Sequence, residues 1–287
     1  MSPRPAPDWA YPHCEALVRD GDHDRYLATL FAPADKRPAL FALYAFSQEC
    51  ARVRETVATS LPGEIRLQWW RDALQGEARG DVKANPVAAA LDDTITRYRL
   101  PRQALVDLVD ARVFDLYDDP MPSVNDLEGY CGETSSVLIR LASVILADGA
   151  DPGAADAAGH AGVAYAVAGL MRAFPWHARR GQVYVPTEIL ERHGVSREQL
   201  VAGQGGPGLL AALAEMRALA RTHLDRARAL RASVKGAIGP AFLATALVPL
   251  YLGAFERPGY DPYKTVVDAP SWRKQLALWR RALAGGI

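Results

Sequence analysis

Two carboxylates and an arginine lie close together in "LYAFSQECARVRE", residues 43–55. Glu49, Arg52 and Glu55 are spaced by three residues, so on a helix they lie roughly on one face. Such a face could bind a metal ion through its carboxylates, or the arginine could pair with both acids as a solvated ion-pair ladder. The spacing alone favours the ladder, and Tyr44, at the apolar end of the segment, is expected near the core.

A second cluster is cationic and lies in "LMRAFPWHARRGQVYVP", residues 170–186. Pro175 lacks a backbone N–H and clashes with the carbonyl four residues before it, so a helix through this segment is predicted to break near Ala173 and Phe174. The cluster would suit a phosphate or a carboxylate, although an ordinary basic surface turn has the same composition. Its members are Arg172, His177, Arg179 and Arg180.

Small and hydroxyl residues form a third feature, "DLEGYCGETSS", residues 126–136. They would let a second helix or a ligand approach closely. Cys131 has no histidine nearby in sequence, so it is not expected to be a nucleophile. The other cysteines, Cys14 and Cys50, complete neither a disulfide framework nor a zinc spacing, which indicates a reducing compartment. No P-loop, H-E-x-x-H, G-x-S-x-G or C-x-x-C motif occurs.

Helical periodicity dominates the chain, and short turns rich in Pro, Gly and Asp separate its segments. No turn is long enough to be a linker, so residues 1–287 are predicted to form one all-α domain. Only residues 182–186 have an extended pattern. The predicted helices cover 37–58, 61–76, 87–98, 102–117, 124–147, 154–173, 208–233, 240–255 and 271–284.

The charges balance, with 33 Lys and Arg against 33 Asp and Glu, so no net field indicates binding to nucleic acid or to an anionic membrane. The first residues, "MSPRPAPDWAYPH", contain no targeting pattern, which favours the cytoplasm, with a peripheral place on the inner membrane left open. Residues 236–255 are uncharged and long enough to span a bilayer. Because Pro240 and Pro249 interrupt them, a buried core helix is favoured, and contact with a membrane surface stays open.

Most of the chain resembles the squalene/phytoene synthase family, in the order "YLATLFAPADKRPALFALYAF", "RLQWWRDAL", "NPVAAAL", "DLEGYCGETSS", "RRGQVYVP" and "ALVPLYLGAFERPGYDPY". The resemblance implies an isoprenoid synthase-type helical bundle with a central apolar cavity. It also implies condensation of two prenyl diphosphates, held by Mg²⁺ on two aspartate-rich helical motifs. Magnesium neutralises the departing diphosphate, and the cavity keeps water away from the carbocation.

This sequence departs from both motifs. Where the family has Asp-Asp-x-x-Asp, it has Ala51, Arg52 and Glu55, and where the second motif has its aspartates it has Ala173 and His177. Loss of these oxygen ligands is expected to lower the rate of the condensation reaction by several powers of ten. The segments "FALYAFSQECARVRE", "LMRAFPWHARRGQVYVPTEILERHGVS" and "SWRK" resemble one branch of the family, that of mitochondrial complex I assembly factor 6 and its bacterial relatives. That resemblance implies a bacterial protein with a role in biogenesis of the respiratory NADH dehydrogenase.

The combined prediction is a non-catalytic bundle, without catalytic residues or cofactor, that binds a prenyl diphosphate or lipid-like ligand, assists complex I subunits or assembly factors, or does both. The predicted anion-binding mouth comprises Arg52, Arg172, Arg179 and Arg180, with Tyr44, His177 and Tyr184 nearby. One alternative is an active Mg²⁺-dependent prenyltransferase of the hopanoid or carotenoid pathway, with a residual metal site drawn from Glu49, Glu55, His177 and Glu133. Another is an interaction scaffold with a filled core and no ligand.

Overall fold

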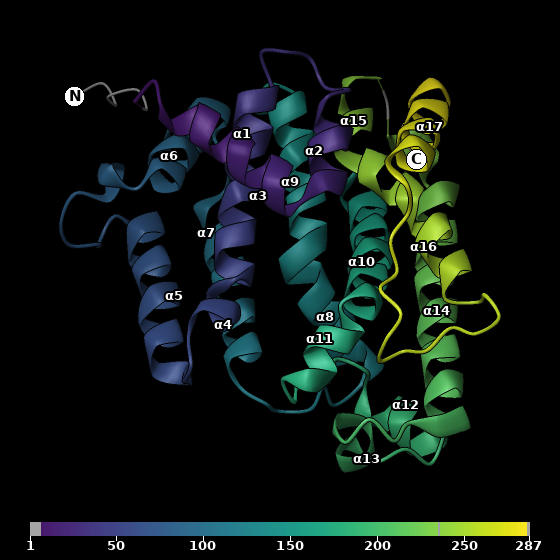
Figure 1. Ribbon diagram of the computed structural model, residues 1–287. Helices are drawn as coiled ribbons and strands as arrows, with labels where there is room; N and C mark the ends of the chain where they lie inside the picture. Colours follow the sequence, from purple (N-terminus) through teal and green to yellow (C-terminus); the bar gives the residue numbers. More distant parts are fainter. Residues whose placement is uncertain (1–6, 235, 286–287) are drawn as a thin grey trace.

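The computed structural model describes residues 7–234 and 236–285, and within them every regular element is a helix (Figure 1). The predicted all-α class is therefore confirmed, whereas the extent of a single domain over residues 1–287 stays a prediction. Helices α3, α9, α10 and α14 pack side by side in that order, and α5 lies at the opposite edge from α14 (Figure 1).

The helices have the following bounds: α1 Ala10–Gly21, α2 His23–Thr29, α3 Arg37–Ala51, α4 Val53–Thr56, α5 Ser60–Gln75, α6 Pro86–Tyr98, α7 Arg102–Ala111, α8 Val124–Cys131, α9 Val137–Leu146, α10 Ala155–Arg172, α11 Phe174–Arg179, α12 Thr187–Arg192, α13 Arg197–Val201, α14 Gly206–Ala229, α15 Gly239–Phe242, α16 Val248–Ala254 and α17 Ser271–Leu283.

The interior consists of two apolar clusters, one around α3 and the other around α10. Helix α3 is buried on nearly all sides, with Phe41 and Phe46 almost inaccessible, as expected of a helix that is apolar all round. Val167 and Met171 of α10 belong to the second cluster. Tyr26 of α2 packs against both clusters, so α2 lies where the two halves of the core meet.

Helix α3 is shorter than the predicted helix over residues 37–58. It ends at Ala51. At Arg52 the backbone changes from α-helical to 3₁₀-type hydrogen bonding, because the Arg52 carbonyl accepts from Glu55 N, three residues later, at 3.0 Å. The short helix α4 follows, and then Val57 is extended. Three β-branched residues, Val53, Thr56 and Val57, have low helix propensity and explain the early end.

The predicted helix over residues 240–255 is also broken, into α15, a 3₁₀ turn at Leu243–Leu247, and α16. Pro249 cannot donate to the carbonyl one turn before it, which accounts for the break. The stretch Gly236–Ala254 is still long and apolar enough to span a membrane, but 61% of the 18-residue apolar window within it is buried inside the protein. Residues 182–186, where the sequence has an extended pattern, form no strand. One backbone hydrogen bond, from Met121 N to the Val183 carbonyl at 3.4 Å, joins them to the loop before α8.

The small residues of 126–136 serve helix packing. Residues Gly132–Ser136 form one π-helical turn between α8 and α9, and Ser136 Oγ donates to the Gly159 carbonyl of α10 at 2.7 Å. A Cβ at Gly162 would lie 2.3 Å from Ser136 Cα. The two helices therefore approach so closely that only glycine fits at position 162.

Replacing Gly162 with alanine is expected to lower the free energy of unfolding by about 1–3 kcal/mol, because the added methyl would force α10 away from the π-helical turn. Urea unfolding followed by circular dichroism measures this. Gly169→Ala on the same helix is the matched control, since a Cβ there meets nothing within 4 Å. An equal effect of the two substitutions would contradict the close approach.

Candidate functional site

The segments 43–55 and 170–186 meet through one carboxylate. Glu55 Oε2 lies 3.8 Å from Arg52 Nε, and Glu55 Oε1 accepts from Arg180 Nη1 at 3.3 Å. All three side chains are exposed by about half, between 41% and 57%. We call Arg52, Glu55 and Arg180 the Glu55 bridge; it joins the end of α3 to the segment after α11. The ion-pair ladder predicted from spacing is present between Arg52 and Glu55, while Glu49 does not take part.

The break predicted near Ala173 and Phe174 is confirmed. Helix α10 ends at Arg172, and α11 begins at Phe174 with Pro175 in its first turn. The Ala173 carbonyl accepts from both Trp176 N and His177 N at 3.0 Å, which turns the chain into the new helix.

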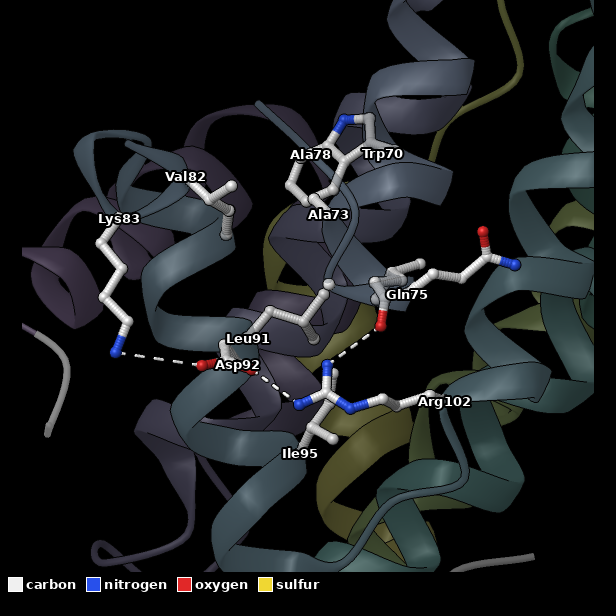
Figure 2. Close-up of a pocket in the computed structure, with 13 residues that line it drawn as sticks. Trp70, Ala73, Gln75, Ala78, Val82, Lys83, Leu91, Asp92, Ile95 and Arg102 are labelled. Carbon is white, nitrogen blue, oxygen red and sulfur yellow. Dashed lines mark hydrogen bonds and ion pairs between the residues drawn. The ribbon is translucent and has the colours of Figure 1, made fainter. Parts of the chain in front are cut away.

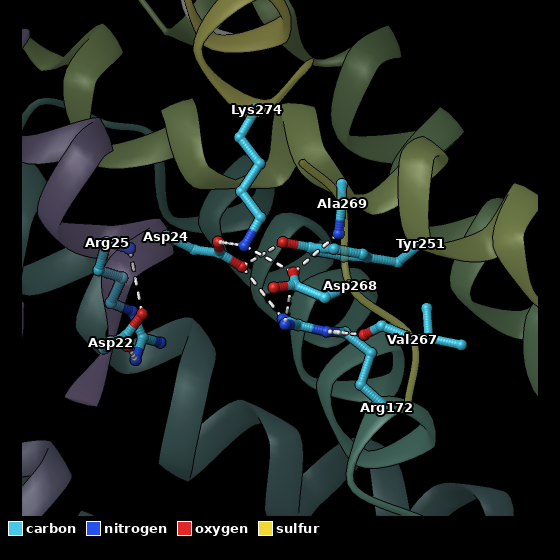
Figure 3. Close-up of polar contacts among 9 residues, drawn as sticks. All are labelled: Asp22, Asp24, Arg25, Arg172, Tyr251, Val267, Asp268, Ala269 and Lys274. Carbon is cyan, nitrogen blue, oxygen red and sulfur yellow. Dashed lines mark hydrogen bonds and ion pairs between the residues drawn. The ribbon is translucent and has the colours of Figure 1, made fainter. Parts of the chain in front are cut away.

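Arg172 has no contact with the Glu55 bridge and belongs to a largely buried polar network (Figure 3). Its Nη1 donates to Asp24 at 3.0 Å and its Nη2 to Asp268 at 3.3 Å, and its guanidinium carbon lies 3.9 Å from the centre of the Tyr251 ring. Lys274 of α17 lies 2.9 Å from Asp24 and 2.6 Å from Asp268. These five residues, the Asp24 cluster, connect α2, α10, α16 and α17.

Tyr44 lies in the interior, 6% exposed, and burial raises the pKa of its hydroxyl to about 12. The Arg25 guanidinium lies 5.3 Å from the Tyr44 ring centre and 5.1 Å from that of Tyr165 on α10, and it pairs with Asp22 at 3.0 Å. An arginine between two tyrosines therefore fills part of the space between α3 and α10.

Tyr184 belongs to a second buried network. It donates to Asp115 Oδ1 at 2.7 Å, Tyr130 donates to the same oxygen at 2.8 Å, and Arg112 donates to Asp115 Oδ2 at 3.0 Å. Burial raises the pKa of the Tyr184 hydroxyl well above its ordinary value. We call these four residues the Asp115 cluster; it fixes the segment after α11 against α8.

His177 packs its ring against Tyr184, with ring centres 4.7 Å apart. Burial lowers its pKa from 6.5 to about 4, although the carboxylate of Asp115 acts in the opposite direction. The folded state thus holds fewer protons on this histidine than the unfolded state, so its contribution to stability is full above the unfolded pKa and is lost as the pH falls toward about 4.

We therefore expect the free energy of unfolding to fall between about pH 7 and about pH 4, with His177 contributing about 1–3 kcal/mol of the loss. His177→Gln should flatten this pH dependence in urea titrations. His13→Gln, at an exposed position of α1, should leave it unchanged. A pH profile that is the same for both variants would contradict the buried neutral imidazole.

The remaining carboxylates of the predicted residual metal site are dispersed. Glu49 is partly buried, which raises its pKa against the opposing effects of Asn85 and Arg66. Glu133 lies near Asp107 and Asp110, and burial raises its pKa as well. Among residues 7–234 and 236–285, no group of three His, Cys, Asp or Glu side chains is placed to hold a metal ion. A Mg²⁺ ion prefers six oxygen ligands, so these residues do not fit it.

The prominent pockets of the described residues lie beside the motif segments and not between them. One, of about 410 Å³, has Glu49, Arg52, Arg66 and Trp69 among its lining residues and opens on the α5 side of α3. Another, of about 400 Å³, lies between α5 and α6 and is lined by Trp70 and Leu91 among others (Figure 2). None of these prominent pockets takes walls from both α3 and α11.

The predicted anion-binding mouth is thus distributed over three places. Arg52 and Arg180 lie together, Arg172 lies in the Asp24 cluster, and Tyr184 with His177 lies at the Asp115 cluster. Arg179 is exposed, and no ion-pair partner for it is found among the described residues. Their role in ligand binding stays a prediction. Sequence reasoning missed Asp24, Arg25, Asp115 and Lys274. Asp24 and Lys274 pair with each other across most of the chain, and although Arg25 and Asp115 each have an ion-pair partner three residues away, the tyrosines that they contact are distant in sequence.

Residues 18–280 match the profile of the family described as squalene/phytoene synthase. Assembly factor 6 of NADH dehydrogenase (ubiquinone) complex I from Rattus norvegicus is 30% identical over 94% of this chain and 82% of its own length. The Homo sapiens protein of that name is 32% identical over 88% of this chain and 76% of its own. The 15-cis-phytoene synthase of Synechocystis sp. is 27% identical over 98% of this chain and 90% of its own length.

Solved structures resemble the fold over nearly the whole chain. Squalene synthase HpnC from Alicyclobacillus acidocaldarius superposes with a TM-score of 0.74 at 24% identity, covering 88% of this chain and 95% of its own. A dehydrosqualene synthase in complex with a ligand gives 0.73 at 18% identity, covering 96% of each. At these identities the likeness concerns the fold, and it confirms the predicted isoprenoid synthase-type bundle.

Proposed function

This chain belongs to the squalene/phytoene synthase family, and we propose that it is a non-catalytic member that assists the assembly of a membrane respiratory complex. We further propose that the protein is bacterial and that it acts at the cytoplasmic side of the inner membrane. It combines two lines of support: the side chains at the two motif positions, and the similarity to assembly factors.

The observation that carries the proposal is the Glu55 bridge. Diphosphate release needs several carboxylates that gather Mg²⁺ and leave it open to the substrate. Here the one carboxylate that remains is paired with Arg52 and Arg180. Two guanidinium groups beside one carboxylate repel a divalent cation, so the charges favour an anion over a metal at this place.

The interior supports the same conclusion. A condensing enzyme needs an apolar cavity that holds two prenyl chains and excludes water from a carbocation. The Arg25 guanidinium lies over the rings of Tyr44 and Tyr165, so a fixed positive charge already occupies the aromatic faces that could otherwise stabilise a carbocation. The proposed function therefore depends on binding by the helical bundle and not on catalysis inside it.

The part in assembly comes from the relatives. Proteins named as complex I assembly factor 6 match nearly the full chain at about 30% identity. A cellular test is deletion of the gene in its host, followed by native-gel analysis of the NADH dehydrogenase and by NADH:quinone activity in membranes. We expect both to fall and to return with the wild-type gene.

The variant Glu55→Ala separates this function from catalysis. Because Glu55 is exposed and pairs only at the surface, the variant should fold and should restore complex assembly as fully as the wild type. A deletion strain with normal NADH dehydrogenase would contradict the proposal. So would a strain whose defect is a missing prenyl product that Glu55→Ala fails to restore.

The proposal also includes binding of a phosphate-bearing ligand. Arg52, Arg179 and Arg180 could hold a prenyl diphosphate or a lipid phosphate directly, since guanidinium groups pair with two oxygens and stay charged. The Kd for farnesyl diphosphate, measured without Mg²⁺, should rise in Arg179→Ala/Arg180→Ala. The control Arg19→Ala/Arg226→Ala removes two exposed arginines elsewhere. An unchanged Kd in the first variant would remove the ligand from the proposal.

The 27% identity to a 15-cis-phytoene synthase favours a second candidate, a synthase-like enzyme. Its distinguishing property is release of diphosphate that depends on Mg²⁺.

A further inference from the structure

The last helix, α17, exposes a stripe of large apolar side chains. Trp272 is 60% exposed, Trp279 56% and Leu283 72%, and Leu276 adds a further 37%. At 3.6 residues per turn these four positions fall within an arc of about 60° on the helix surface. Single exposed apolar residues are ordinary, but four on one face mark an interaction surface.

The orientation of the stripe is fixed from the other side of the helix. Lys274 and Leu278 are buried, and Lys274 makes the ion pairs with Asp24 and Asp268 described above (Figure 3). Rotation of α17 that hid the tryptophans would pull the Lys274 ammonium out of the Asp24 cluster. The buried cluster therefore holds the apolar stripe toward the outside.

The charges next to the stripe are positive. Arg273 and Arg280 are exposed and follow the stripe around the helix, and the Arg273 guanidinium lies 5.2 Å from the Trp272 ring centre. Helix α17 contains no Asp or Glu in Ser271–Leu283. Since the whole chain has no net charge, this helix is a local cationic surface.

Apolar surface continues beyond α17. Phe31, 38% exposed, lies after α2 and lines a pocket of about 320 Å³ together with Pro240 and Ala282 of α17. This pocket therefore continues the apolar surface of the stripe at the C-terminal end of α17.

We propose that α17 docks this protein onto an anionic membrane surface, with Trp272, Trp279 and Leu283 in the boundary between headgroups and acyl chains. An interfacial helix has this composition: Trp and Leu on one face and arginines beside them. Tryptophan favours that boundary, and each arginine near an anionic surface adds attraction. A second copy of the chain is a poorer occupant, because two identical stripes face to face would bring their arginines together.

This inference stands independently of the proposed function and concerns a different surface from the Glu55 bridge. Its test is co-sedimentation of the full chain with phosphatidylcholine vesicles, with and without phosphatidylglycerol. We expect binding to the anionic vesicles to be about tenfold tighter or more than to the neutral ones, from two arginines at the surface.

Trp272→Ser/Trp279→Ser should weaken binding to the anionic vesicles by about tenfold or more, since two interfacial aromatic side chains are lost. The matched control is Leu61→Ser/Ile65→Ser on α5, where the two side chains are 64% and 62% exposed and the binding should persist. Arg273→Gln/Arg280→Gln should reduce the preference for anionic over neutral vesicles. Circular dichroism checks that each variant is folded.

Three results would overturn the proposal: no binding of the wild type to anionic vesicles, equal loss of binding in the α5 control, or a preference for anionic lipid that survives removal of both arginines. Light scattering tests whether a second copy of the chain covers the stripe instead. A dimer that dissociates in Trp272→Ser/Trp279→Ser, without vesicle binding by the wild type, would assign the stripe to contact between copies.

Discussion

Replacing Asp24 with alanine is expected to lower the free energy of unfolding by about 3–5 kcal/mol, the usual cost of removing one partner from a buried ion pair. Asp24 is 4% exposed and lies within 3.0 Å of both Arg172 and Lys274. Without it, two cations share Asp268 alone, and that residue is half exposed. The cluster holds α17 and α10 to α2, so its loss should loosen the whole end of the bundle.

Urea unfolding measures the Asp24 effect. Asp20→Ala, on the exposed end of α1 beside Arg19, is the control and should change the free energy of unfolding by less than about 0.5 kcal/mol. Lys274→Met should cost less when Asp24 is already absent, because the uncompensated ammonium is then removed. Additive effects of Asp24→Ala and Lys274→Met would contradict a shared cluster.

Replacing Asp115 with alanine is expected to cost about 3 kcal/mol or more. Its carboxylate accepts bonds from Tyr130 and Tyr184 and pairs with Arg112, and it is 6% exposed. The substitution leaves a buried guanidinium without its carboxylate and two phenol groups without an acceptor. Because Tyr184 also contacts His177, the segment after α11 should lose its fixed position.

Tyr184→Phe removes only one of these bonds and should cost about 1 kcal/mol. Asp118→Ala serves as the control, since Asp118 is 53% exposed and pairs with Arg54 at 3.5 Å. Near-ultraviolet circular dichroism should report the loss of tyrosine packing in Asp115→Ala. A stability equal to that of the Asp118 variant would show that the Asp115 cluster contributes little.

Local patterns in the sequence predicted much of the fold. The apolar run through Tyr44 and Phe46 gave α3, Pro175 gave the break after α10, and the small residues before Val137 gave close packing against Gly162. The first two depend on neighbours within a few residues, and for the third the local run of small residues predicts a close approach but not its partner on α10. The end of α3 at Ala51 was not predicted, because the apolar and charged pattern continues past it and only the β-branched residues disfavour a helix.

The site could be predicted only in part, for a physical reason. In sequence, Arg172 and Arg180 are equivalent cations on either side of Pro175. Folding gives Arg172 a buried partner in Asp24 and gives Arg180 an exposed one in Glu55. Which carboxylate reaches which arginine depends on contacts between α2, α4, α10 and α11, and no spacing along the chain carries that information.

The two clusters give Arg172 and His177 structural roles that involve no metal ion. Arg172 supports the fold through Asp24 and Tyr251, whereas a carboxylate at 177 would be buried beside Tyr184 with Asp115 nearby. Two neighbouring buried carboxylates repel each other unless a metal lies between them. The neutral imidazole of His177 suits a bundle without that metal.

We propose that this bundle does not perform metal-dependent chemistry on prenyl diphosphates. The most direct measurement is incubation of the purified chain with radiolabelled farnesyl and geranylgeranyl diphosphate, with and without Mg²⁺ and NADPH, scored for released diphosphate and hydrocarbon product. The Glu55 bridge predicts no release above the protein-free background in any of these conditions. Release that requires Mg²⁺ and disappears in Glu55→Ala would contradict the claim and would establish a working metal site at the end of α3.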